Sequence, residues 1–123
     1  MIEAKALVTP WQVTFRAGEL DGLADTVKAG VGGSAGMRPH ELLEASLATC
    51  MTISARMALA ELGADGTDVS VRVYLERESS VTRFRYELAL GPALEVHRPA
   101  VVDRLACSPV LTTLSKQLLF EPA

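Results

Sequence analysis

The sequence from Gly36 to Gly63 reads GMRPHELLEASLATCMTISARMALAELG. Pro39 suits the first position of a helix, because its missing N–H would have no partner there, and Gly63 suits a terminator, because glycine tolerates a positive φ. The residues between them are mostly strong helix formers. They predict one helix of about 24 residues, roughly 36 Å long, with Cys50 at its centre.

Apolar or small side chains occupy almost every direction around this predicted helix. A helix that is apolar all round is normally buried on all sides. Charged residues such as Glu44 and Arg56 interrupt it too often for a membrane span, which needs about 20 predominantly apolar residues. We therefore expect the central helix of a soluble core, with no membrane partner. A chain of 123 residues has little material to cover such a helix, which predicts a homodimer.

The sequence on either side of the helix predicts antiparallel strands. Alternating apolar and polar residues predict a hairpin with one wet face, whose apolar face covers the helix. Shorter alternating runs predict a small N-terminal sheet. The expected strands are residues 2–8, 11–16 and 20–27 in that sheet and 69–75 and 83–90 in the hairpin. The fold class is therefore α+β, in a single domain spanning residues 1–123.

Shorter segments complete the expected fold. The glycine-rich run 30–36 lacks the Lys-Ser/Thr of a phosphate-binding loop and is interpreted as a flexible connector. Residues 94–96 are expected to form a short edge strand and residues 99–106 a short helix. Ser108 suits the N-cap, and Pro109 the first residue, of another helix with an apolar stripe of Leu111, Leu114 and Leu118.

Composition excludes several classes of function. A net charge of -3 with no basic stripe argues against nucleic acid as a partner. The N-terminus shows no signal peptide, so we expect a cytoplasmic location. The two histidines and two cysteines show no metal-ligand spacing, so no metal site is expected. Cys50 and Cys107 are either inert core thiols or a redox pair.

Thiol redox chemistry would make demands on these two cysteines. A peroxidatic cysteine must be a thiolate, which needs a nearby cation or hydrogen-bond donor. Cys50, in mid-helix, gains little from a helix end, so we expect an arginine from elsewhere to help it. Cys107 stands just ahead of a predicted helix N-terminus, which favours a thiolate. A second thiol can condense a sulfenic acid to a disulfide.

The order of motifs along the chain resembles the OsmC/Ohr family of hydroperoxide-reducing proteins. A glycine-rich loop precedes P-x-E-L-L-x-A-x-L-A-x-C, from Pro39 to Cys50, and a long apolar helix and a strand pair follow. The chain then reads C-x-P-V-x-x-T-L from Cys107 to Leu114. The resemblance implies an OsmC-like fold of two intertwined protomers, with long central helices packed between antiparallel sheets and sites at the subunit interface.

The resemblance also implies an activity and its residues. Cys50 would be the peroxidatic cysteine and Cys107 the resolving cysteine, joined in a disulfide during turnover. An N-terminal arginine would assist, with Arg16 the best candidate and Arg38 the second, and Glu41 would match the family's glutamate. The family reduces organic hydroperoxides with electrons from small dithiols or dihydrolipoyl proteins, and it uses no bound cofactor.

The sequence departs from the family's pattern at two of these positions. The Ohr branch places its glutamate directly after the proline, where this chain has His40, and nine residues at about 100° each put Glu41 about 180° from Cys50 around a straight helix. Ser108 intervenes in the usual C-P-V. We therefore expect a peroxidase of oxidative or osmotic stress defence. The alternative is a non-catalytic OsmC-like protein that binds a small apolar ligand or senses redox state.

Overall fold

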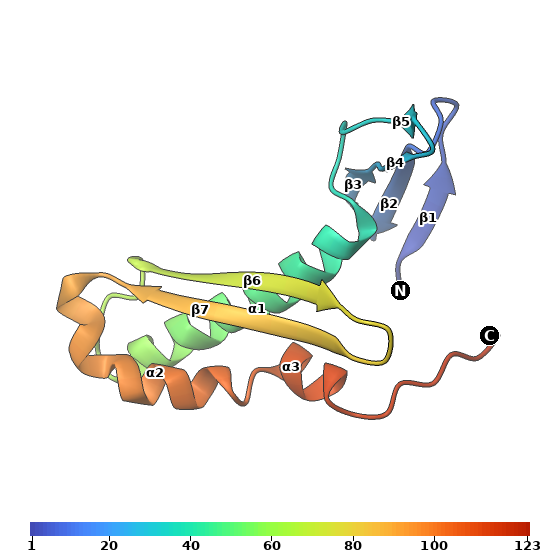
Figure 1. Cartoon of the computed structure of the whole chain (residues 1–123). Helices are drawn as coiled ribbons and strands as arrows, with labels where there is room; N and C mark the ends of the chain where they lie inside the picture. The colour runs from blue at the N-terminus through green and yellow to red at the C-terminus, as the bar shows by residue number, and fades with distance from the viewer. The chain divides into compact units, whose positions relative to one another are not determined.

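Helix α1 (Pro39–Glu61) is the longest element of the structure, a computed structural model that describes residues 1–123 (Figure 1). It begins at Pro39 as predicted. Gly63, with φ of 72°, ends it, and the Gly63 N–H donates to the carbonyl of Ala60. The fold is α+β with antiparallel sheets. The chain divides into an N-terminal unit, Met1–Leu43, and a C-terminal unit, Glu44–Ala123.

The N-terminal unit contains a three-stranded antiparallel sheet, as predicted. Its strands are β1 (Glu3–Ala6), β2 (Val13–Ala17) and β3 (Leu20–Ala24), in the order β1-β2-β3. Phe15 on β2 lies opposite Gly22 on β3. A Cβ atom at Gly22 would come within 2.4 Å of the Phe15 ring, so the glycine provides the space that the ring occupies.

The glycine-rich run 30–36 begins in a short hairpin and leads from it to α1. The hairpin consists of β4 (Val27–Lys28) and β5 (Val31–Gly32). The carboxylate of Asp25, which is 2% exposed, accepts the N–H of Thr26 at 2.8 Å and the N–H of Ala35 at 3.1 Å. The sequence did not predict this hairpin, because two-residue strands carry no periodic pattern and because the bonds come from Asp25, which lies outside the glycine-rich run.

The core of the C-terminal unit forms where α1 packs against a hairpin and two further helices. The hairpin consists of β6 (Val69–Arg77) and β7 (Thr82–Leu90), which confirms the predicted strand pair. Helices α2 (Arg98–Leu105) and α3 (Pro109–Leu114) follow. The buried apolar residues form one cluster drawn from α1, β6 and the segment after β7: Leu47, Met51, Ala55, Ala58, Leu59, Val71, Val73, Leu94, Val101 and Leu105.

Two predictions for the C-terminal part of the chain were wrong. Residues 94–96 are not an edge strand but part of a 3-10 helix, η1 (Pro92–His97), because Pro92 fits a helical first position and the Leu94 N–H closes a turn on the Gly91 carbonyl. The expected apolar stripe also stops early: α3 ends at Leu114, and Leu118 is exposed.

Burial of α1 on all sides is not complete within one chain. Leu47, Met51 and Leu59 are fully buried, whereas Ile53 and Met57 are 59% and 54% exposed. One face of α1 therefore remains uncovered, and the second subunit stays a prediction. By length and composition alone α1 could also cross a membrane, a test that core helices of globular domains pass equally.

Candidate active site

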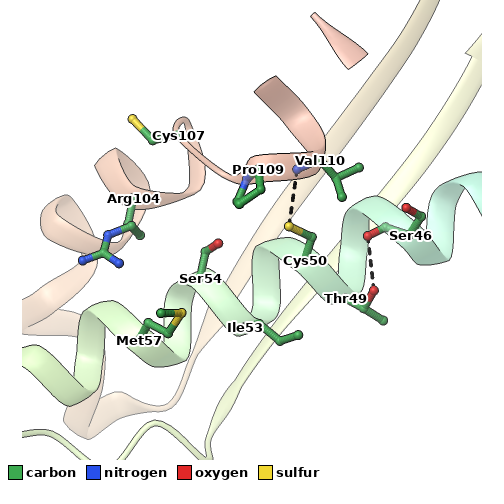
Figure 2. Close-up of a pocket in the computed structure, with 10 residues that line it drawn as sticks. All are labelled: Ser46, Thr49, Cys50, Ile53, Ser54, Met57, Arg104, Cys107, Pro109 and Val110. Carbon is green, nitrogen blue, oxygen red and sulfur yellow. Dashed lines mark hydrogen bonds between the residues drawn. The ribbon is translucent and has the colours of Figure 1, made fainter. Parts of the chain in front are cut away.

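A groove of about 510 Å³ lies in the C-terminal unit, between α1 and the segment that joins α2 to α3 (Figure 2). Its lining is mostly apolar, with small hydroxyl side chains and one cation. Both cysteines belong to it, so folding brings together two thiols that lie far apart in the sequence. The lining residues are Ser46, Thr49, Cys50, Ile53, Ser54, Met57, Arg104, Cys107, Pro109 and Val110.

Cys50 is a half-buried, free thiol in the middle of α1. Its Sγ accepts a hydrogen bond of 3.5 Å from the backbone N–H of Val110 (Figure 2). Cys50, which we expected to gain little from a helix end, therefore has a backbone donor in the first turn of a different helix, α3.

Cys107 is an exposed, free thiol between α2 and α3. It lies just ahead of α3 as predicted, but the N–H group of that helix turn meets the Cys50 sulfur instead. In Figure 2 the Cys107 side chain points away from Cys50. Ser108 flanks the helix start as predicted, yet its hydroxyl makes no cap and donates to the carbonyl of Leu105 at 2.8 Å.

Arg104 is the site residue that the sequence analysis missed. It lies in the last turn of α2, lines the groove with both cysteines and forms an ion pair with Glu61 at the end of α1. The available signal was its place one helical turn before Cys107 in a predicted helix. Its position against α1 depends on packing between distant segments, which the sequence pattern does not contain.

The other predicted site residues belong to the N-terminal unit, where each has a partner of its own. Arg16 on β2 pairs with Asp21 on β3 at 3.4 Å, and both side chains are well exposed. Glu41 accepts the N–H of Arg38 at 3.0 Å. This bond satisfies a free donor at the start of α1, as in a capping box. Catalytic roles for Arg16, Arg38 and Glu41 stay predictions.

The fold and the two free thiols define a class of protein, an α+β thiol protein with its cysteines at one groove. The model of the OsmC-like protein family matches residues 32–121. The chain therefore belongs to the OsmC family. No curated protein sequence matches the chain significantly.

Solved structures share the fold at low sequence identity. A protein of Psychrobacter arcticus, described as an osmotic stress induced and detoxification response protein, aligns with a TM-score of 0.75 and 14% identity over 91% of this chain and 85% of its own. An OsmC-like protein of Mycoplasma pneumoniae aligns with a TM-score of 0.70 and 17% identity over 93% of this chain and 85% of its own. The organic hydroperoxide resistance protein OsmC of Legionella pneumophila aligns with a TM-score of 0.61 and 16% identity over 94% of this chain and 88% of its own.

Proposed function

We propose that this protein is a cysteine-based peroxidase that reduces organic hydroperoxides in oxidative or osmotic stress defence. The observation that carries the proposal is the Cys50 thiol, half-buried in a largely apolar groove and in contact with the Val110 N–H. The apolar lining suits an organic tail. Membership of the OsmC family and the name of the Legionella pneumophila structure support this reaction class.

In the first step, the Cys50 thiolate attacks the outer oxygen of the hydroperoxide. An S–O bond forms, the O–O bond breaks, and the released alkoxide takes a proton to leave as the alcohol. Cys50 becomes a sulfenic acid, and the peroxide is reduced by two electrons. The Val110 N–H donates to the sulfur that attacks.

In the second step, the Cys107 thiolate attacks the Cys50 sulfur. An S–S bond forms, the S–O bond breaks, and the oxygen leaves as water after taking a proton. A small dithiol or a dihydrolipoyl protein then reduces the disulfide by thiol exchange. Both thiols line one groove, which supports their pairing.

A guanidinium would complete this site by pairing with the thiolate and orienting the peroxide. We assign this role to Arg16, on the family resemblance, with Arg38 as the second candidate. Glu41 would hold that arginine in place. Arg104 lines the groove and pairs with Glu61, but it does not match the arginine that the family resemblance implies, so we give it no role at the reacting sulfur.

A second copy of the chain would cover the open face of α1. Ile53 and Met57 line the groove and are more than half exposed, so an apolar partner surface there would turn an open groove into an enclosed pocket. This supports the proposed intertwined homodimer; that each protomer is a single domain spanning residues 1–123 stays a proposal. A cytoplasmic location fits a cycle that depends on reducing thiols.

Turnover of cumene hydroperoxide with a dithiol tests the proposal. We expect Cys50→Ser to lose all turnover, because the attacking sulfur is gone. Cys107→Ser should still react once with peroxide and remain as a sulfenic acid or a higher oxide. Equal, partial loss in both variants would contradict the assigned roles.

A non-catalytic apolar-ligand protein of the same fold is the second candidate. It is favoured by the outward direction of the Cys107 side chain, which leaves the two thiols unpaired in the structure. Mass spectrometry after brief exposure to cumene hydroperoxide separates the two functions. Thiols that stay reduced support the binding protein, whereas rapid oxidation of Cys50 supports the peroxidase.

A further inference from the structure

The junction between α2 and α3 fixes the backbone on both sides of Cys107. Ser108 is fully buried, and its hydroxyl donates to the Leu105 carbonyl at 2.8 Å. The Ser108 N–H donates to the same carbonyl at 3.1 Å, and the Cys107 N–H donates to the Arg104 carbonyl at 3.0 Å. Cys107 itself is exposed, with its side chain directed away from Cys50 (Figure 2).

The same junction holds the donor for Cys50. The Ser108 carbonyl accepts the Thr112 N–H at 2.9 Å, which ties Ser108 to the first turn of α3. That turn places the Val110 N–H against the Cys50 sulfur. The bonds of Ser108 therefore hold the backbone next to Cys107, and from there the Cys107 side chain points away from Cys50 (Figure 2). One short junction thus carries both the backbone donor to the first thiol and the second thiol itself.

We propose that Ser108 is a positioning residue that delays resolution, so that the Cys50 sulfenic acid persists until the turn Leu105–Ser108 opens. This inference rests on the proposed peroxidase function. When the turn opens, the Cys107 thiolate attacks the Cys50 sulfur and the oxygen leaves as water. Before that, a thiol reductant in solution attacks the same sulfur, displaces the same oxygen as water and forms a mixed disulfide with Cys50.

Two serine variants test this role with a matched control. Ser108→Ala removes the hydroxyl bond to Leu105, whereas Ser115→Ala removes a bond of the same kind and length, to the Leu111 carbonyl, at the far end of α3. Each reduced protein is mixed with one equivalent of cumene hydroperoxide and quenched at intervals with dimedone, which traps sulfenic acids. Intact mass then gives the trapped and disulfide fractions.

We expect wild type and Ser115→Ala to accumulate the dimedone adduct of Cys50. Ser108→Ala should close the disulfide about 3- to 10-fold faster, as expected when one hydrogen bond that resists opening is lost, with a smaller trapped fraction. Disulfide closure at one rate in all three proteins, or a wild type that closes the disulfide with no trapped sulfenic acid, would overturn the inference.

A second arm keeps this inference separable from the proposed activity. Oxidised glutathione replaces the hydroperoxide: the exposed Cys107 thiolate attacks it and releases one glutathione. The Cys50 thiolate then attacks the mixed disulfide and releases the second. Closure should again be faster in Ser108→Ala. If only this arm shows the difference and hydroperoxide leaves Cys50 reduced, the peroxidase proposal fails and the positioning role of Ser108 stands.

Discussion

The two units of the chain are stabilised in different ways. In the C-terminal unit, α1 anchors one cluster of buried apolar residues. In the N-terminal unit only Ala24 and Asp25 are buried, and the strands are held by backbone ladders and by the bonds of Asp25. The hydrophobic driving force is therefore concentrated around the helix that carries Cys50, and the N-terminal unit has little apolar burial of its own.

The largest effect should come from the core of the C-terminal unit. Met51 is fully buried on α1, so Met51→Ala should lower the free energy of unfolding by about 3 kcal/mol, from lost burial and the cavity left behind. Leu20→Ala, at a residue 78% exposed on β3, should change it by less than about 0.5 kcal/mol. Urea unfolding followed by far-UV circular dichroism measures both. Similar losses would mean that the N-terminal unit is held by apolar burial after all.

A smaller loss should follow from removing the carboxylate that fixes the glycine-rich segment. Asp25→Ala leaves the N–H groups of Thr26 and Ala35 without their acceptor, at a cost of about 2 kcal/mol. Asp21→Ala, at an exposed residue, is the control. Trp11 is the only tryptophan and lies in the N-terminal unit, so its fluorescence in urea reports this change. Equal midpoints for both variants would show that the Asp25 bonds do not stabilise the unit.

The arginine proposed to assist Cys50 lies in the N-terminal unit, so its test compares the two units functionally. On that proposal, Arg16→Met should lower kcat/KM for cumene hydroperoxide about tenfold, or about 1.4 kcal/mol, because the reacting sulfur loses its cation. Arg104→Met should lower it less than about twofold, because the proposal gives Arg104 no role at that sulfur. The reverse order would show that the C-terminal unit provides its own cation.

The smallest effect concerns an exposed ion pair beside the core. The hydrogen bond from Arg98 lowers the pKa of Glu95 below its usual 4.5. A carboxyl group whose pKa is lower in the folded than in the unfolded protein stabilises the fold at pH values above its unfolded-state pKa. This stabilisation is lost as the pH falls through its folded-state pKa. The urea midpoint of Glu95→Gln should therefore fall less than that of wild type when the pH is lowered from neutral to below 4.5. An unchanged pH profile would mean that the pair contributes nothing.

Sequence periodicity predicted the elements that are long enough to show it. The alternation of apolar and polar residues along β6 and β7 predicted the hairpin. The run of helix formers from Pro39 to Gly63 predicted α1 and the position of Cys50 in its middle. The two-residue strands β4 and β5 and the helix η1 are too short for such a signal. The Val110 contact with Cys50 joins residues 60 positions apart, so it arises from packing and not from any local pattern.

The wet face of the β6–β7 hairpin has a consequence for how the protein behaves in concentrated solution. Arg72 lies opposite Glu87, and Glu76 forms a diagonal ion pair with Arg85, so opposite charges meet across a two-stranded sheet whose outer edges are unpaired within the chain. Open edges invite strand-by-strand stacking between molecules, and charged neighbours oppose it. Salt that screens these charges should therefore promote aggregation, and low ionic strength should keep concentrated solutions of the protein free of aggregates.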